Sequence, residues 1–208
     1  MPRETAQAIL RKTHVNAIMD SNTSHDAALP FNYALSSGEM PVPKPYRAGM
    51  YGGKFLPFHR GHLYCLETAS RLCDVVYQIL MVGCVDEDRI RGEDNRLDGA
   101  LLEPAFRYRA MRSAGARLGN VRTIYMDISA CRTADGAEDW DAETPLVLAA
   151  CGHFDAVFSS EESYGDYFAR AYPWAEHVLV DPPRVVVPIS GTEVRAMETE
   201  AAKAWIQR

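Results

Sequence analysis

Two histidines, His59 and His62, lie three residues apart where a predicted strand gives way to a predicted helix, and Lys54 follows Gly52 and Gly53 just before them. A helix N-terminus presents unpaired N–H groups and a positive dipole end to an anion. Glycines let a ligand come close to the backbone. These residue types together indicate a phosphate site. Two alternatives stay open here: a metal-binding pair, for which further ligands in register are missing nearby, and two ordinary surface histidines.

Ser190 and Thr192 stand at the start of a second predicted helix, and Arg195 falls in its first turn. A hydroxyl at a helix start can cap the helix or bind a phosphate oxygen. The planar guanidinium of arginine can reach the same anion with several donors. These residues predict either a second phosphate-binding element or a plain capping segment. The inner face of this helix is expected to carry Val194, Met197, Ala201 and Trp205.

Two stretches of the chain together resemble a known family. Residues 53–62 read Gly-x-Phe-x-Pro-x-His-x-Gly-His, and residues 189–195 read Ile-Ser-x-Thr-x-x-Arg. The pair resembles the signature motifs of the nucleotidylyltransferase superfamily. Over residues 47–206, the chain looks most similar to the nicotinamide mononucleotide adenylyltransferase domain of bifunctional bacterial proteins that also carry a ribosylnicotinamide kinase. Residues 158–162 and 178–184 support that likeness.

The resemblance implies a Rossmann-like α/β fold and an enzyme that joins the AMP of ATP to nicotinamide mononucleotide, giving NAD and pyrophosphate. Such a transfer needs positioning and charge stabilisation more than covalent help. The expected catalytic residues are His59 and His62 at the triphosphate, Lys54 at the attacking phosphate, and Arg195. The expected ATP-binding residues are Gly52, Gly53, Phe55, Gly61, Ile189, Ser190 and Thr192. The expected acceptor-binding residues are Trp140, Arg107, Asp86 and Glu161.

The acceptor is expected to lie against Trp140, which resembles an aromatic residue that family members stack on the nicotinamide ring. A cationic pyridinium gains from an aromatic face, although Trp140 could equally anchor a lid or pack in the core. Mg²⁺ is expected to be carried by ATP oxygens and water, without a protein metal cluster. Nearby acids are expected to favour the nicotinamide over the nicotinate form: Glu138, Asp139, Asp141, Glu161 and Glu162.

Alternating strand and helix patterns support a doubly wound, five-stranded parallel sheet. The apolar run at 75–82, with Gln78 inside it, is typical of a strand buried on both faces. The other predicted strands are at 47–51, 121–126, 156–159 and 177–180, and further helices are predicted at 104–118 and 164–171. A charged loop at 86–98 and a long connection at 127–144 are expected to border the ligand crevice at the strand ends.

Length and composition limit the remaining choices. The 208 residues suffice for one α/β domain, expected at 47–208, after a partly helical N-terminal extension at 1–46. A formal net charge of −6 argues against a broad basic surface for nucleic acid. The sequence has no apolar run of membrane-spanning length, and its five scattered cysteines are expected to be buried thiols in a reducing cytoplasm.

Other functions stay open at this point. A sister enzyme of the superfamily could transfer AMP to phosphopantetheine or CMP to a sugar or polyol phosphate. A non-catalytic nucleotide sensor could retain the same fold. Kinase activity is not expected, because the sequence contains no Gly-x4-Gly-Lys-Ser/Thr loop. A homo-oligomer is left open.

Overall fold

The computed structural model describes residues 43–93 and 95–207. The extension predicted over 1–46 therefore falls almost entirely outside the described residues, and so does its helix. None of the described helices combines the length and the apolar character needed to cross a membrane.

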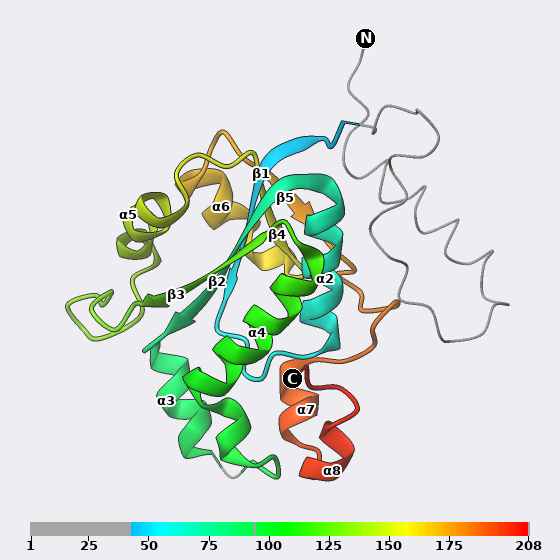
Figure 1. Cartoon of the computed structure of the whole chain (residues 1–208). Coiled ribbons are helices and arrows are strands. Elements are labelled where there is room, and N and C mark those ends of the chain that lie inside the picture. Colours follow the sequence, from blue (N-terminus) through cyan, green and yellow to red (C-terminus); the bar gives the residue numbers. More distant parts are fainter. Residues whose placement is uncertain (1–42, 94, 208) are drawn as a thin grey trace, which may run out of the picture. The chain divides into compact units, whose positions relative to one another are not determined.

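Five strands form one parallel sheet in the order β3-β2-β1-β4-β5, which confirms the predicted architecture (Figure 1). The strands are β1 (Tyr46–Gly53), β2 (Cys73–Val82), β3 (Val121–Asp127), β4 (Ala156–Ser159) and β5 (Glu176–Leu179). The helices are α2 (Arg60–Leu72), α3 (Val85–Gly92), α4 (Pro104–Leu118), α5 (Trp140–Cys151), α6 (Gly165–Ala171), α7 (Gly191–Arg195) and α8 (Thr199–Ala202). Two short 3-10 helices span Gly99–Leu102 and Glu162–Tyr164.

Helices cover both faces of the sheet, as in a doubly wound fold (Figure 1). Helices α2 and α4 contact β1, β2 and β3 on one face. On the other face, Val147 of α5 joins a core cluster with Met50 and Ile79 of the central strands, and Phe168 of α6 packs against that cluster. Strand β2 lies between β1 and β3 and is buried on both faces, as its apolar run predicts.

The five cysteines are buried and form no disulfide, which agrees with the expectation of buried thiols. The first strand was predicted to end at residue 51, but Gly52 and Gly53 continue β1 and pair with Ile79 and Leu80 of β2. The strand therefore carries both glycines to the carboxyl end of the sheet, where the next residue is Lys54.

Three helix assignments need correction. The charged loop expected at 86–98 contains α3, because Cys84 Sγ caps it and acids in its first turn with arginines in its last suit the helix dipole. The long connection at 127–144 ends in α5, whose start is capped by the carboxylate of Asp139. Pro145 lies inside this helix and hides it from pattern reading.

The single C-terminal helix expected after Ser190 is two short helices, α7 and α8. The carbonyl of Arg195 accepts a hydrogen bond from the Leu97 amide, and Thr199 Oγ1 accepts one from the Asp98 amide. These long-range bonds compete with continuation of the helix. Val194 is buried as predicted, but Ala202 is buried in place of Ala201.

Candidate active site

A cavity of about 460 Å³ opens at the carboxyl ends of β1 and β4. These two strands are neighbours at the point where the strand order reverses, which is where open parallel sheets bind ligands. The starts of α2 and α7 border one part of the cavity, and the start of α5 with α6 borders another. All the site residues predicted from the sequence line this cavity except Arg107.

His59 and His62 are held by capping the helix that they begin. His59 precedes α2, and its Nδ1 accepts a hydrogen bond from the Gly61 amide at 3.1 Å. His62 Nδ1 accepts one from the His59 amide at 3.3 Å. This reciprocal cap satisfies two N–H groups that a helix start leaves unpaired. The imidazole rings stack with centroids 3.7 Å apart, so the helix start fixes both rings side by side.

The capping bonds determine where each histidine carries its proton. Because Nδ1 accepts a backbone N–H in both rings, the neutral imidazoles carry their hydrogen on Nε2. Burial lowers the pKa of His59 to about 4, and the charges of Arg184 and Arg195 act in the same direction. Burial is the main cause that lowers the pKa of His62, and the electrostatic effect of the neighbouring His59 ring acts in the same direction. Both rings are therefore neutral donors at pH 7.

Gly61 is required by this arrangement. A Cβ at position 61 would lie 3.0 Å from Cε1 and 3.2 Å from Nδ1 of the His59 ring. The ring could not keep its bond to the residue 61 amide without moving. On the other side of the pair, Phe55 is buried and meets the His62 ring edge-on at a centroid distance of 4.9 Å. The Phe55 side chain thus supports His62, and Phe55 adopts a left-handed φ of 49° at the cavity wall.

The second motif supplies Arg195 and Thr192 to the cavity. Arg195 Nη1 donates to the Leu56 carbonyl at 2.7 Å, and Nη2 donates to Thr192 Oγ1 at 3.1 Å. Ser190 behaves as the capping alternative predicts, since its hydroxyl accepts from the Glu193 amide and donates to the Glu193 carboxylate. The Ser190 hydroxyl is therefore occupied, whereas Thr192 and Arg195 keep donors beside the cavity.

The C-terminal segment is fastened to the histidine loop by backbone hydrogen bonds. The Arg60 amide donates to the Trp205 carbonyl at 2.8 Å, and the Gln207 amide donates to the Phe58 carbonyl at 3.0 Å. A Cβ at Gly191 would lie 3.1 Å from the Leu56 carbonyl oxygen, so the close approach of the two motifs depends on this glycine. The C-terminal segment is thereby held against the histidine loop at the cavity.

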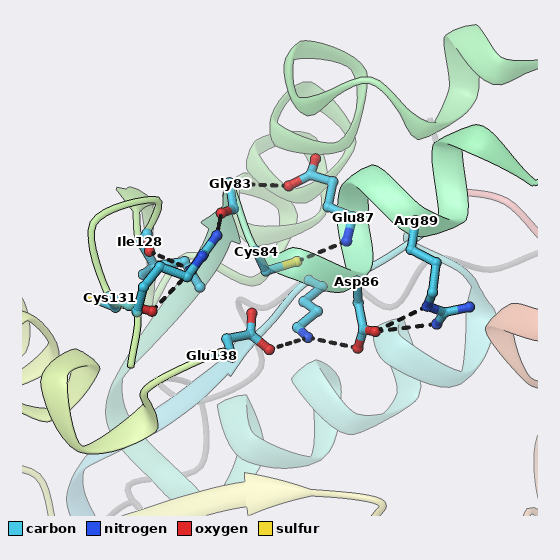
Figure 2. A network of polar contacts seen from close by, with 10 residues as sticks. Gly83, Cys84, Asp86, Glu87, Arg89, Ile128, Cys131 and Glu138 are labelled. Atoms are coloured by element: carbon cyan, nitrogen blue, oxygen red, sulfur yellow. Dashed lines mark hydrogen bonds and ion pairs between the residues drawn. The ribbon is translucent and has the colours of Figure 1, made fainter. Parts of the chain in front are cut away.

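Lys54 lies between two carboxylates that come from different elements. Its Nζ contacts Glu138 Oε2 at 2.8 Å and Asp86 Oδ2 at 3.0 Å, with Glu138 on the loop before α5 and Asp86 on α3 (Figure 2). Burial acts to lower the Lys54 pKa, but the hydrogen bonds to Glu138 and Asp86 outweigh it and raise the pKa. The lysine is therefore a fixed cation at the end of β1.

Arg107 does not line the cavity, and its expected acceptor-binding role is wrong. Its side chain is fully buried in α4, where the guanidinium pairs with Glu87 and donates to the carbonyls of Leu102 and Lys54. Glu87 in turn accepts from the Gly83 amide at 2.8 Å (Figure 2). A buried cation needs such partners, and this one uses them to hold the backbone at Lys54 in place.

Aromatic side chains line the part of the cavity that the start of α5 and α6 border. Trp140 is the first residue of α5 and is 36% exposed, and its ring meets Tyr164 and Tyr167 edge-on at 5.5 and 5.1 Å. Glu161, at the end of β4, pairs with Arg184. Of the acids expected near the ring, Glu138 and Glu161 line the cavity, while Asp139, Asp141 and Glu162 do not.

Among the charged residues that line the cavity, Glu143, Asp181 and Arg184 were not predicted as site residues. The two carboxylate oxygens of Asp181 accept hydrogen bonds from the amides of Val185, Val186 and Val187. These bonds fix the loop that carries Arg184. Both Asp181 and Arg184 have positive φ values, 48° and 52°. The Pro182-Pro183 pair between them marks a turn in the sequence, but no local pattern reveals the carboxylate contacts.

Comparisons with known proteins agree with this geometry. No family model matches the sequence. The "Trifunctional NAD biosynthesis/regulator protein NadR" of Escherichia coli (strain K12) is 27% identical over 150 residues, and the protein of the same name from Salmonella typhimurium is 27% identical over 153. Each match covers 71% of this chain but only 36% of the relative, so the chain spans little more than a third of these proteins.

Two solved structures share the fold. A crystal structure of NadR protein in complex with NAD and AMP-PNP matches with a TM-score of 0.54 at 18% identity, covering 78% of this chain and 45% of that one. Another, in complex with NR, matches with a TM-score of 0.54 at 17% identity, covering 80% and 43%. The chain is therefore similar in sequence to part of these NadR proteins, and it shares its fold with the two solved structures.

Proposed function

We propose that the protein transfers the AMP of ATP to nicotinamide mononucleotide, giving NAD and pyrophosphate. The observation that carries this proposal is the stacked pair of neutral histidines at the start of α2, which lies in one cavity with Thr192 and Arg195. Such a set of fixed donors suits a polyphosphate. The relatives named for NAD biosynthesis support the choice of acceptor.

The reaction is an in-line displacement at phosphorus. A 5′-phosphate oxygen of the mononucleotide attacks the α-phosphorus of ATP, the bond to the β-phosphate oxygen breaks, and pyrophosphate carries that electron pair away. Nε2–H of His62 donates to the α-phosphate as negative charge accumulates there, and His59 donates to the adjoining phosphates. Thr192 and Arg195 hold the β- and γ-phosphates. Lys54 neutralises the attacking phosphate.

Mg²⁺ would accompany ATP. Among the described residues, no three His, Cys, Asp or Glu side chains are grouped as metal ligands would be. We assign the ion to phosphate oxygens and water, as expected for Mg²⁺, and there it would neutralise charge on the leaving pyrophosphate. The protein residues orient the substrates. The capped start of α2 and the two carboxylates that hold Lys54 fix the hydrogen-bond donors in place before the substrates bind.

The acceptor ring would lie on the aromatic side of the cavity. Trp140 offers a face to a cationic pyridinium, a contact of about 1–2 kcal/mol when water is excluded. Tyr164 and Tyr167 contact the Trp140 ring in T-shaped arrangements and help to hold it in place. The ribose phosphate would then extend toward Lys54, which joins the aromatic and histidine sides of the cavity.

The proposal is tested by incubating the protein with ATP, Mg²⁺ and a panel of acceptors while pyrophosphate release is followed. Nicotinamide mononucleotide is expected to be the best substrate, ahead of phosphopantetheine and sugar or polyol phosphates. Release with another acceptor alone would assign a different transferase. Binding of ATP without release from any acceptor would assign a nucleotide sensor.

Variants at His62 separate catalysis from helix capping. His62→Ala is expected to lower turnover by roughly 10²–10³, the scale of one lost transition-state donor. His62→Ala also removes the nitrogen that accepts the hydrogen bond from the His59 amide. Glutamine can accept this bond, because it is a usual capping residue at the third helical position. His62→Gln is therefore expected to lose turnover to a similar degree and to retain more stability. Near-normal turnover in both variants would refute the role of His62.

A further inference from the structure

Glu143 is a buried carboxylate at the cavity with an unsatisfied oxygen. The residue is 6% exposed and lines the cavity from α5. Its Oε1 is buried and has no hydrogen-bond partner, and the same holds for Oε1 of Glu138. In the described part of the chain only three buried side-chain atoms lack a partner, and two of them are these carboxylate oxygens. Buried polar atoms are normally paired, so an unpaired one at a cavity points to a ligand.

The surroundings of Glu143 do not neutralise it. Lys54, on the end of β1, is already held by Glu138 and Asp86. The loop before α5 presents Arg132, Cys131, Asp139 and Glu138, and the Arg132 guanidinium is taken up by the carbonyls of Gly83, Ile128 and Cys131. From α6 and the residue after it come the hydroxyls of Tyr167 and Tyr172. Burial, followed by the charge of Glu138, raises the pKa of Glu143 to about 7.

Glu143 lies one helical turn after Trp140. Residues three apart on a helix lie on the same face, and both of these residues line the cavity. A ring stacked on Trp140 would therefore bring a substituent within reach of Glu143. What the carboxylate requires from that substituent is an N–H or O–H donor.

We infer that Glu143 selects the acceptor by its ring substituent, binding a primary amide and excluding a carboxylate. This inference rests on the proposed function and assigns its acceptor specificity to one residue. An amide N–H₂ donates to the unpaired oxygen. A substrate carboxylate meets like charge in a partly desolvated site as long as Glu143 is ionised. Once Glu143 is protonated, its O–H can donate to that carboxylate, so the selectivity depends on pH.

The test compares nicotinamide and nicotinate mononucleotides as acceptors from pH 6 to 8.5 at fixed ionic strength. The measured quantity is the ratio of their kcat/KM values at each pH. Both acceptors carry the same 5′-phosphate, so its titration cancels in the ratio. The wild-type protein is expected to prefer the amide by at least about tenfold at pH 8, with the preference falling severalfold toward pH 6. A fall of the ratio toward pH 6 indicates that a carboxylate becomes protonated in this range, as expected for Glu143.

Glu143→Gln tests the assignment, because a glutamine side chain has the same shape and can either accept or donate. Its selectivity is expected to fall below about threefold and to be independent of pH. Asp141→Asn is the matched control: it removes one charge from the same helix at a residue that does not line the cavity, and it should leave the pH-dependent ratio unchanged.

The outcomes separate this inference from the proposed function. If neither mononucleotide releases pyrophosphate, the proposed function fails. If the amide is a substrate but Glu143→Gln keeps the wild-type ratio and its pH dependence, Glu143 does not select the acceptor. The inference is also overturned if Asp141→Asn changes the ratio as much as Glu143→Gln, because a general acidic field would then explain the selectivity.

Discussion

Replacing Glu143 with glutamine should stabilise the fold, and the gain should grow with pH. The folded protein raises the pKa of this carboxyl from its ordinary value of 4.5 to about 7. An acid with a raised folded-state pKa binds more protons when folded than when unfolded, so stability is lost as pH rises from about 4.5 to 7. This difference corresponds to at most ~3 kcal/mol, since water entering the cavity would screen the charge.

Glutamine has no charge to bury, so it removes this pH-dependent destabilisation. The assay is chemical or thermal unfolding of wild type and Glu143→Gln at pH 5 and pH 8.5. We expect a small difference at pH 5 and an advantage for the variant of roughly 2 kcal/mol at pH 8.5, or about 4–8 °C in Tm for a chain of this size. A difference that is equal at both pH values would refute the shifted pKa. Asp141→Asn, at an exposed site, serves as the control.

Two further substitutions test the aromatic wall and the Asp181 loop. Trp140→Ala is expected to raise KM for the mononucleotide by roughly 5- to 30-fold, with a smaller effect on KM for ATP; equal increases would favour a role as a structural anchor of α5. Asp181→Asn removes one of two oxygens that together accept three amides, and it should speed hydrogen exchange at Val185, Val186 and Val187, as measured by mass spectrometry. Unchanged exchange would show that the loop is held by other contacts.

The sheet and the two end motifs were predictable because their signals are local. The apolar run of β2 marks a strand buried on both faces, and Gly83 marks its end. The motif residues collect at one cavity because parallel strands all present their carboxyl ends at the same edge. His59 and Ser190 were each expected beside a helix start, and the structure shows that both cap their helices with their side chains.

The remaining features depend on partners that are distant in sequence. Helix α3 is too charged to show an apolar face, and it packs through buried Ile90 and through the pairing of Glu87 with the buried Arg107. Arg107 was expected to bind the acceptor, since no local pattern shows that a cation will find a partner twenty residues away. Glu143 gave no signal at all, because a missing hydrogen-bond partner is a property of the folded cavity.

The cavity combines hydrogen-bond donors and cations that protein contacts already fix with a carboxylate oxygen, Oε1 of Glu143, that has no hydrogen-bond partner. His59, Arg195 and Lys54 each have protein partners that hold them in place, namely the Gly61 amide, the Leu56 carbonyl and two carboxylates. Donors fixed in this way need no reorganisation as charge moves to the leaving pyrophosphate, which is where electrostatic catalysis gains most. Glu143, by contrast, keeps a buried oxygen without a partner, and that destabilises the protein until a ligand supplies the donor. The side of the cavity assigned to the chemistry is therefore preorganised, and the side assigned to acceptor selection is completed by the correct acceptor.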